Sequence, residues 1–441
     1  MAAERNIVIV GGGFAGTTLA RSLERRLPRG HRVVLVSEES YTTFNPMLAE
    51  VVSASVFPEH VVAPIRQMLH PAAASRFVMG RVGAVDLEQR CLTASTLAGE
   101  TTIAFEHLAL AFGTRAELDL VPGSAAHALP LKLVGDALFL RNRVLQRVAR
   151  IELEHDRDAR LRLGHFIVIG GGYSGVEVAG ALADFLRGAR RYYPRVDAHE
   201  LKVSLVEVGA RLLPELPDHL GDAAARSLRA RGIDIHLQAR AERVDAGGVS
   251  LVGGRRLDGA TVVCTIGTRA NPLAARLGLP VERGRIVAAA DLSVPGHDGV
   301  WAIGDCALVP NAASGGFAPP TAQFAVAQAH ALAQNLVARI DGRPTRPFAH
   351  AAKGAMATTG HLKGVAQLYG VSLSGLPAWL LWRAYYLLQM PTLGRKLRIW
   401  LEWTLSMAFA GDITHLRFTR THEADAAPAA EALASPSITP P

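Results

Sequence analysis

The chain has 441 residues, of which 49% are hydrophobic and 20% charged, and it carries a formal net charge of +8. This length predicts two or three domains with cores of their own. The three cysteines lie far apart in sequence, which excludes a fold stabilised by disulfides and argues against a zinc site or a local redox disulfide. The basic residues are scattered and form no nucleic-acid-binding motif, so we expect no nucleic-acid partner, and an anionic membrane surface fits a basic and apolar chain better.

The first recognisable unit is a glycine-rich turn between a strand and a helix. The apolar strand NIVIV begins almost at once, so we expect no secretory signal, and the sequence GGGFAG follows it. Gly11, Gly13 and Gly16 are spaced as Gly-x-Gly-x-x-Gly, which lets backbone N–H groups at a helix N-terminus approach a pyrophosphate. A second strand is expected at residues 31–36, and Glu38 beyond it is placed to accept ribose hydroxyls.

The same arrangement occurs again further along the chain. A strand at residues 165–170 leads into GGYSGVEVAGALADFL, and a strand at residues 201–207 closes on Glu207. The glycines of this second turn are Gly170, Gly172 and Gly175. We expect the charged stretch at residues 187–200 to be a surface insertion. Two complete turns predict two dinucleotides and electron transfer between them.

A third segment, GVWAIGDCA at residues 299–307, makes the two sites unequal. An apolar strand ends here in Gly304 and Asp305, ahead of another helical pattern. A helix-capping role would explain Asp305 alone but not the whole motif. The segment resembles one in the pyridine-nucleotide flavoprotein reductases, where it returns to the first domain and its aspartate binds the ribityl chain of FAD. That resemblance implies FAD on the first turn and NADH on the second.

The cysteines do not form the pair that many such reductases use as a redox disulfide. Cys91 and Cys264 lie in expected strands, where we interpret them as buried apolar residues, and Cys306 beside Asp305 is a single thiol. A sulfide:quinone reductase would need further, well-placed cysteines. The remaining chemistry is direct transfer from nicotinamide to flavin to a small acceptor.

Four further segments narrow the resemblance to the type II NADH:quinone oxidoreductases. Residues 41–69 are similar to that family's Phe-x-Pro-Leu-Leu segment with its following Pro-Ile-Arg, and residues 121–145 to its linker into the NADH domain. Residues 318–336 carry its Ala-Gln pair, and residues 353–387 resemble its last domain. The resemblance covers about residues 5–420. It implies FAD as cofactor, NADH as substrate and a membrane quinone, ubiquinone or menaquinone, as acceptor, without proton pumping.

The resemblance also implies roles for particular residues. Glu177 and Gln323 are the implied catalytic residues, with Glu177 near the nicotinamide and Gln323 beside the flavin. Ala322, Gln323 and Gln328 would form the wall of the quinone pocket, and Gly267 joins the NADH-binding set. Glu177 also falls in the expected first turn of its helix, where a carboxylate is favoured by the helix dipole, and this simpler role stays open.

Nicotinamide preference should depend on the end of the second unit. Glu207 is expected to bind the adenosine ribose of NADH and to repel the 2′-phosphate of NADPH, although Arg211 is close enough in sequence to weaken that repulsion. Three positions depart from the family pattern: Ser37, where an acidic residue is usual one place before Glu38; residues 111–115, which replace Ala-Thr-Gly-Ser; and Cys264, where tryptophan is common. The residue that contacts the FAD ribose therefore stays open.

The predicted fold class is α/β, with two Rossmann-like dinucleotide-binding domains, for FAD and for NADH, and a C-terminal membrane-anchoring domain of amphipathic helices. The FAD domain is predicted in two parts, at residues 1–120 and 276–345, with the NADH domain at 121–275 between them. Residues 346–420 form the predicted C-terminal domain, and residues 421–441 a disordered tail.

The C-terminal domain is predicted to touch a membrane through residues 376–410. Two stretches there keep helical spacing of apolar and aromatic residues: Trp379, Trp382, Arg383, Tyr386, Leu387 and Met390, and then Leu397, Trp400, Leu401, Thr404, Leu405 and Ala408. Between them Arg395, Lys396 and Arg398 suggest a basic hinge. This pattern is typical of a monotopic anchor in the headgroup layer. We expect this anchor on the cytoplasmic side of the inner membrane. A homodimer interface or a core-packing helix pair is the alternative, and an anchor and a homodimer are compatible.

Two other classes of function stay open at this stage. A soluble flavin reductase or diaphorase would use the C-terminal helices for dimerisation and would not favour long-chain quinones. A non-catalytic nucleotide sensor would leave the flavin turn and the Gly-Asp motif unexplained.

Overall fold

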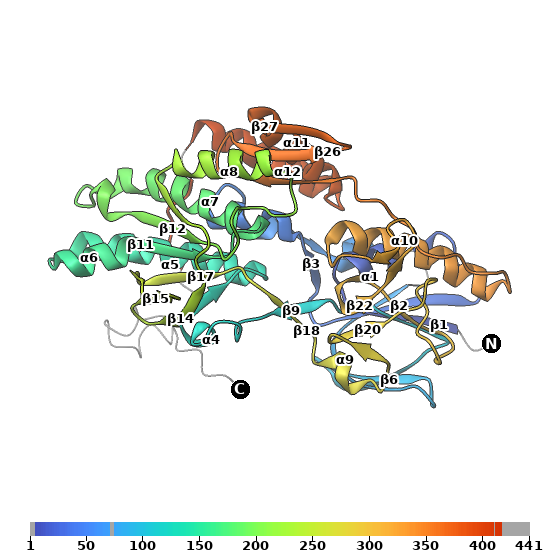
Figure 1. Cartoon of the computed structure of the whole chain (residues 1–441). Coiled ribbons are helices and arrows are strands. Elements are labelled where there is room, and N and C mark those ends of the chain that lie inside the picture. Colours follow the sequence, from blue (N-terminus) through green and yellow to red (C-terminus); the bar gives the residue numbers. More distant parts are fainter. Residues whose placement is uncertain (1–4, 71–74, 410, 417–441) are drawn as a thin grey trace.

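Two parallel sheets and a C-terminal layer make up the computed structural model, which describes residues 5–70, 75–409 and 411–416. In Figure 1 the first sheet lies on the right, the second on the left, and the C-terminal layer above the second. This is the predicted α/β class with two dinucleotide-binding units. The tail predicted at residues 421–441 lies outside the described residues.

The centre of the first sheet is formed by short runs of β-branched and aliphatic residues that are buried on both faces. Its parallel strands, in sheet order, are β21 (Val300–Ala302), β8 (His107–Leu110), β1 (Arg5–Val10), β2 (His31–Ser37) and β5 (Arg76–Asp86). An antiparallel extension adds β6 (Cys91–Thr96) and β7 (Gly99–Ala104). Because β21 pairs with β8, the segment at residues 299–307 returns to the first sheet as predicted.

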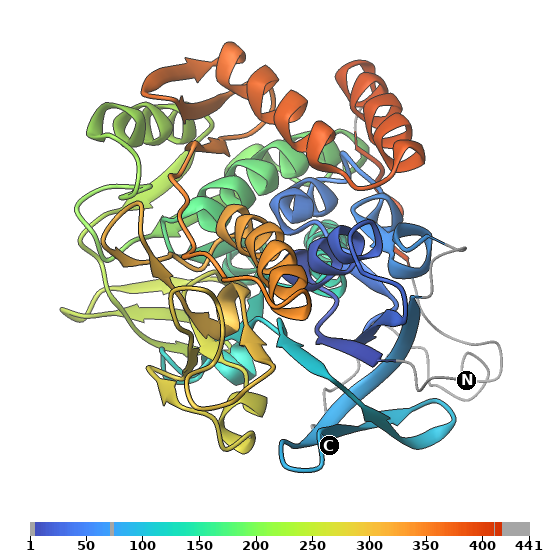
Figure 2. The ribbon, with the colours of Figure 1, turned by 90° about the vertical axis from the view of Figure 1, so that its right-hand side faces the viewer.

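Two helices from distant parts of the chain pack together over the first sheet. They are α1 (Phe14–Glu24), which follows the first glycine turn, and α10 (Ala322–Ile340), and they lie side by side in Figure 2. The N-termini of both helices approach the turn that follows β21, since a Cβ added at Gly304 would lie 3.2 Å from Ala15 and 3.9 Å from Ala325. The sheet therefore brings three functional segments to one edge.

The second sheet repeats the parallel pattern in the middle of the chain. Its strands, in sheet order, are β10 (Ala128–Pro130), β17 (Thr261–Cys264), β11 (His165–Ile169), β12 (Lys202–Val206) and β13 (Ile233–His236). Its main helices are α5 (Val134–Leu153), α7 (Tyr173–Ala189) and α8 (Asp218–Arg229).

The segment at residues 187–200 is mostly exposed, as the sequence predicted for a surface insertion, but its two ends join the folded core. Helix α7 continues through its first three residues, and Glu200 at its end is buried. The Glu200 carboxylate accepts hydrogen bonds from Arg160 at 2.6 and 2.8 Å. A charged composition concealed this packing because a buried ion pair uses the same residue types as a solvated loop.

The chain crosses between the two sheets on a short antiparallel ribbon. This ribbon pairs β9 (Thr114–Ala116) with β18 (Thr268–Ala270). The first crossing leads into the second sheet and the second crossing leads back, so the first sheet is assembled from two separate parts of the chain.

Smaller elements complete the two units. In the first part they are β3 (Tyr41–Thr43), η1 (Asn45–Met47), α2 (Leu48–Val52), η2 (Pro58–His60), β4 (Val62–Pro64) and α3 (Ile65–Met68). Around the second sheet they are α4 (Ser124–His127), α6 (Arg157–Gly164), η3 (Arg190–Tyr192), η4 (Ala198–Glu200), β14 (Ala241–Asp245), β15 (Gly248–Leu251) and β16 (Arg256–Asp258). After the second crossing they are α9 (Leu273–Arg276), β19 (Val281–Glu282), β20 (Arg285–Val287), η5 (Gly304–Cys306), β22 (Ala307–Leu308), β23 (Pro310–Asn311) and β24 (Gly316–Phe317).

The C-terminal layer is a three-stranded antiparallel sheet followed by two helices. Its elements are β25 (Gly354–Thr358), β26 (Gly364–Leu368), β27 (Val371–Gly375), α11 (Leu376–Gln389) and α12 (Leu393–Ala408). Apolar residues of this layer share a core with α2, α5 and α7. Within the described ranges no helix is long and apolar enough to cross a membrane.

The structure corrects the predicted membrane face of the first C-terminal helix. Trp379, Trp382 and Arg383 of α11 are buried, and so is Trp403 of α12, which leaves Trp400 as the exposed tryptophan of the two helices. Besides Trp400, the large apolar residues that these helices expose are Leu376, Leu380 and Leu388 of α11 and Leu393, Leu397, Leu401, Leu405 and Met407 of α12. The predicted stripe at residues 397–408 is thus on the outside, whereas the predicted stripe of α11 faces the core.

The predicted basic hinge also takes a different form. Arg395, Lys396 and Arg398 lie within α12, and the connection between the two helices is residues 390–392. The Lys396 Nζ atom donates to the carbonyl oxygen of Leu388 at 2.8 Å and so ties α12 to the end of α11.

Candidate functional site

The first glycine turn has the geometry of a dinucleotide cradle. Gly11 adopts a φ of +117° and its N–H donates to the carbonyl oxygen of Val36 at 2.8 Å, which joins the turn to β2. A Cβ at Gly16 would collide with the carbonyl oxygen of Gly11, so only glycine allows α1 to pack this closely on the turn. Gly13 faces open space at the N-terminus of α1. That space, in front of free N–H groups, fits a pyrophosphate.

The second turn reproduces this geometry contact by contact. Gly170 adopts a φ of +112°, and its N–H donates to the carbonyl oxygen of Val206 at 2.8 Å. A Cβ at Gly175 would collide with the carbonyl oxygen of Gly170, while Gly172 faces open space at the start of α7. The residues present therefore fit two dinucleotides, one on each sheet.

The two strand ends each place one side chain beside a glycine turn. Val36 and Val206 accept equivalent hydrogen bonds, so Ser37 and Glu207 occupy equivalent positions. The Glu207 carboxylate accepts from the N–H of Gly171 at 2.5 Å and of Gly209 at 2.6 Å, which holds it beside the turn.

Glu38, predicted to bind the FAD ribose, lies one residue beyond this equivalent position. Its carboxylate is half-exposed and pairs with Arg115 at 2.8 Å and with Arg81 at 3.9 Å. A Cβ added at Gly12 would instead meet the side chain of Ser37. The structure therefore places Ser37, and not Glu38, nearest to the turn.

The Gly304–Asp305 turn is held from behind by Gln328. Its side-chain oxygen accepts a hydrogen bond from the N–H of Gly304 at 2.7 Å, and Gln328 is buried. Burial raises the pKa of the Asp305 carboxyl, and the positive charges of Lys132 and Arg285 oppose this shift. Sequence reasoning assigned Gln328 to the quinone pocket, but the contact that the structure shows is structural support of this turn.

Ala322 and Gln323 form the first turn of α10, as predicted. The backbone before them is extended at Thr321, and no side chain caps the helix. The two side chains are half-buried at the edge where α1 and the Gly304 turn meet α10. Gly267, the last predicted NADH residue, lies in the loop between β17 and β18, where Leu120 packs closely against it.

Glu177 occupies a different environment from the one expected. It lies in the second turn of α7, and the first turn contains no acidic residue, so the helix-dipole role does not apply. Its Oε1 atom accepts from the backbone N–H of Thr358 at 3.1 Å and from Trp382 Nε1 at 3.0 Å. Burial raises the pKa of this carboxyl to about 8; the two hydrogen bonds oppose the shift and the charge of Glu50 adds to it. At neutral pH the protonated form is therefore favoured.

Two charged residues that sequence reasoning did not assign to a functional site, Glu50 and Arg383, complete this cluster. Glu50 of α2 accepts a hydrogen bond from Trp403 Nε1, and its Oε1 atom lies 3.7 Å from Arg383 Nη2. The Arg383 guanidinium is stacked between two indoles, 3.8 Å from the Trp379 ring centre and 4.7 Å from that of Trp403. The available signal was a single charged residue inside each of two apolar runs, MLAEVV and WLLWRAYYLL.

A chain of aromatic rings connects this cluster to the first glycine turn. Phe14 begins α1 and lies 5.7 Å from Phe44, which lies 5.7 Å from Tyr386. Tyr386 lies 4.8 Å from Trp382, the indole that donates to Glu177. Aromatic side chains of α1, of Phe44 just before η1, and of α11 thus lie between the carboxyl of Glu177 and the first cradle.

The three cysteines form no disulfide in the structure. All three are free. Cys306 is fully buried, and burial raises the pKa of its thiol to about 12. Cys264 is buried in β17, whereas Cys91 begins β6 and is partly exposed, so only one of the two strand cysteines fits the predicted buried role.

Comparison with known proteins agrees with this geometry. The pyridine nucleotide-disulphide oxidoreductase family model matches residues 5–329. The type II NADH:quinone oxidoreductase Ndh of Mycobacterium tuberculosis is 30% identical over 416 residues, covering 91% of this chain and 87% of the relative. The demethylphylloquinone reductase NdbB of Synechocystis is 30% identical over 409 residues, covering 91% and 96%. A structure of NDH2 from Plasmodium falciparum in complex with NADH superposes with a TM-score of 0.87 at 18% identity, covering 93% of this chain and all of that one, which shows the shared fold.

Proposed function

Because the chain belongs to the type II NADH:quinone oxidoreductases of the pyridine nucleotide-disulphide oxidoreductase family, we propose that it transfers a hydride from NADH to FAD and two electrons on to a membrane quinone, without pumping protons. The observation that carries this proposal is the pair of equivalent glycine turns on two sheets. A protein with one such turn would serve a single dinucleotide, whereas two turns allow a donor and an acceptor to meet in one chain.

In this proposal the first cradle holds FAD, which when bound accepts a hydride and passes on electrons. Gly11, Gly13 and Gly16 would receive its pyrophosphate, and Gly304 and Asp305 its ribityl chain. The second cradle, with Gly170, Gly172 and Gly175, would receive NADH. Purified protein should therefore be yellow and should lose its visible absorbance when NADH is added without oxygen. A colourless preparation that FAD cannot reconstitute would contradict the assignment.

Glu207 should make the enzyme prefer NADH. Replacing Glu207 with Gln removes the negative charge that would repel a 2′-phosphate, while the side-chain oxygen can still accept from Gly171 or Gly209. Arg211 forms an ion pair with Asp218, so its positive charge is already paired and does little to weaken the repulsion between Glu207 and a 2′-phosphate. We expect kcat/KM for NADPH relative to NADH to rise roughly tenfold. Glu242 is exposed, and Glu242→Gln is the control. An unchanged ratio in Glu207→Gln would show that Glu207 does not distinguish NADH from NADPH.

We propose that the outer faces of α11 and α12 lie on the cytoplasmic side of the inner membrane. The support is their exposed leucines together with Trp400, whose exposed fraction is 53%. The side chains can enter the headgroup layer while the inner faces hold the core. A quinone dissolved in the bilayer would then reach the protein from the surface on which it rests.

Charged substitutions on this surface should release the protein from lipid. In a flotation assay with anionic vesicles, Leu397→Asp combined with Leu401→Asp should lower the partition coefficient about 100-fold, because each leucine contributes about 1.5 kcal/mol or more when removed from water. Leu97→Asp is the control, since Leu97 is 88% exposed on the β6–β7 turn. If the double variant still floats, the anchor is elsewhere.

The same surface tests the proposed homodimer. Two exposed apolar helix faces on one chain are also typical of an interface between subunits. If the double variant changes the mass in sedimentation but not vesicle binding, the surface serves dimerisation, and a soluble diaphorase becomes the better description.

A further inference from the structure

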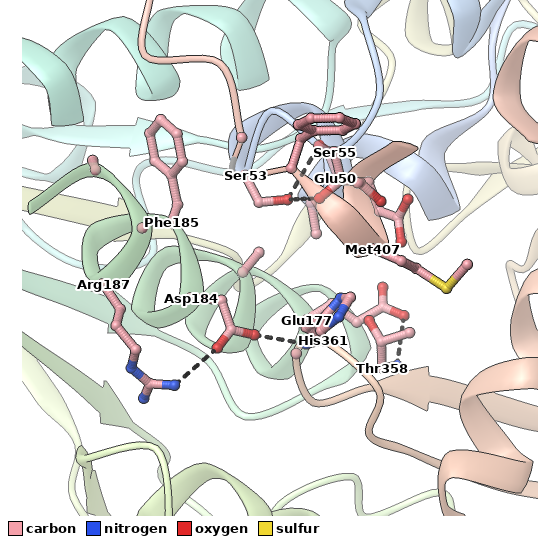
Figure 3. Close-up of a pocket in the computed structure, with 18 of the residues that line it drawn as sticks. Glu50, Ser53, Ser55, Glu177, Asp184, Phe185, Arg187, Thr358, His361 and Met407 are labelled. Carbon is pink, nitrogen blue, oxygen red and sulfur yellow. Dashed lines mark hydrogen bonds and ion pairs between the residues drawn. The ribbon is translucent and has the colours of Figure 1, made fainter. Parts of the chain in front are cut away.

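A cavity of about 300 Å³ opens where the C-terminal ends of α7 and α12 meet α2 and the β25–β26 turn. In Figure 3 Arg187 lies on the left of this cavity, beside Asp184, and Met407 lies on the right. The lining is therefore basic where α7 ends and apolar where α12 ends. Both ends belong to the surface, since Arg187 and Met407 are exposed.

The basic side of the cavity is formed by two arginines four residues apart. Arg187 lies in the last turn of α7 and Arg191 lies in η3, and the backbone between them stays helical at Ala189 and Arg190. Side chains at this spacing share one face of a helix, and both arginines line the cavity. Arg191 is exposed and has no ion-pair partner among the residues that the structure describes. Two guanidinium groups can therefore bind one anion between them.

The acidic groups of the cavity do not cancel this positive charge. Asp184 pairs with the largely buried Arg231 at 2.8 Å, and Glu50 lies 3.7 Å from the buried Arg383. Burial raises the pKa of the carboxyl in the second turn of α7, which favours its neutral form. The inner carboxylates are thus matched by arginines of their own, and the charge at the mouth of the cavity is left for a ligand.

The apolar side of the cavity is the end of the exposed face of α12. Met407 and Phe409 line the cavity, and their exposed fractions are 56% and 68%. Leu401 and Leu405 continue the exposed apolar face along the helix. Tyr192, which ends η3, exposes an aromatic ring of the kind that is enriched at membrane–water interfaces. A pair of cations beside an apolar surface fits a ligand with an anionic head and apolar chains.

We propose that the mouth of this cavity binds the phosphate of an anionic phospholipid, with Arg187 and Arg191 as its ligands and the exposed end of α12 as the seat of its acyl chains. This inference rests on the proposed membrane surface and adds to it a site for one class of lipid. Charge and apolarity together select this occupant: a quinone has no anion for the arginines, and an acidic peptide has no chains for Met407 and Phe409. The exposed stretch at residues 187–200 then lies against the headgroups.

Replacing both arginines with glutamine tests the site on vesicles. Arg187→Gln combined with Arg191→Gln should lower the partition coefficient on vesicles that contain phosphatidylglycerol about 30-fold, because each arginine near an anionic surface contributes about a factor of 5. Binding to vesicles of phosphatidylcholine alone should change little, because the leucines of α12 remain. The double variant should fold, since both side chains are exposed and the ion pair of Arg187 with Asp184 is a surface pair.

Two further double variants separate a built site from general attraction by charge. Arg276→Gln with Arg283→Gln removes the same charge from exposed positions in α9 and between β19 and β20, in the lower half of Figure 1, whereas α12 lies at the top. It should leave both partition coefficients unchanged. Arg187→Lys with Arg191→Lys keeps the charge and removes the planar donor forks that fit a phosphate. It should bind the anionic vesicles more weakly than the unmodified protein, and equal binding would show diffuse attraction without a site.

A short-chain lipid distinguishes a phospholipid site from a site for a free phosphate group. Dihexanoylphosphatidylglycerol, kept below its micellar concentration, should bind the unmodified protein and broaden in phosphorus NMR. Glycerophosphoglycerol, the same headgroup without acyl chains, should bind at least about tenfold more weakly, because it buries no apolar surface. The glutamine double variant should bind neither. Equal binding of the two compounds by the unmodified protein would overturn the lipid assignment.

The possible failures are distinguishable from one another. If the glutamine double variant binds anionic vesicles as the unmodified protein does, the two arginines are not phosphate ligands and the inference is overturned. A changed mass in sedimentation with unchanged lipid binding would assign the arginines to a contact between subunits instead. If the unmodified protein binds no vesicles of either kind, the proposed membrane surface is refuted, and the titration with the short-chain lipid still decides whether the site exists.

Discussion

Exchanging Gln323 for phenylalanine will leave the reaction with NADH intact and slow the reaction with quinone on the order of 100-fold. Gln323 lies in the first turn of α10, half-buried at the edge where α1 and the Gly304 turn meet. A larger ring there would fill space beside the first cradle that we assign to the acceptor. The second cradle, on the other sheet, is not altered. In a stopped-flow experiment the flavin should bleach at its original rate and recover slowly.

A glutamine on the same helix provides the control. Gln334 of α10 is exposed, so Gln334→Phe adds the same ring outside the site. It should change neither step. If Gln323→Phe leaves recovery by quinone untouched, the acceptor binds elsewhere around the flavin, and the assignment of Ala322 and Gln323 is wrong.

Glu177→Gln should slow the same step for a different reason, again on the order of 100-fold. The glutamine keeps the shape of the carboxyl and can accept from Thr358 and Trp382, but it has no proton to give. Because burial favours the protonated form of Glu177 at neutral pH, we expect little change in the rate at which NADH bleaches the flavin. If both steps in the variant keep the rates of the unmodified enzyme, Glu177 does not deliver the proton.

The pH dependence of this variant follows from the sign of the pKa shift. The pKa of Glu177 is raised from 4.5 to about 8, so a proton is required for full rate and the quinone step of the unmodified enzyme should fall as the pH rises through about 8. The variant should be slow and nearly independent of pH in this range. The titration of Glu177 should also affect the free energy of unfolding. Between pH 4.5 and about 8 the native protein holds the proton of Glu177 and the unfolded protein does not, so the free energy of unfolding falls as the pH rises through this range. This contribution should be absent in Glu177→Gln.

The local parts of the fold could be predicted because their chemistry is contained in a few consecutive residues. A glycine turn needs a strand before it, a helix after it and no side chain at the contact points, and all three are visible in residues 6–24 and 165–189. The return of residues 299–307 to the first sheet rested on a resemblance, and the pairing of β21 with β8 confirms it.

The surroundings of Glu177 could not be predicted, because they are made by contacts between distant segments. Trp382 lies 205 residues from Glu177 in sequence, and Trp403 lies 353 residues from Glu50. Helical periodicity showed which residues of α11 share a face but not whether lipid or protein covers that face, since both environments accept apolar side chains. Two of the indoles that we expected at the membrane, those of Trp382 and Trp403, instead donate hydrogen bonds to the buried carboxyl groups.

The most direct measurement is anaerobic oxidation of NADH by the FAD-loaded enzyme with a water-soluble quinone, with ferricyanide as a parallel acceptor. We expect rapid oxidation in both cases, one quinol formed for each NADH consumed, and the uptake of one proton per quinol, recorded with a pH indicator. Oxidation of NADH with ferricyanide but not with quinone would contradict the account, since it would leave a flavoprotein that accepts hydride but has no quinone site.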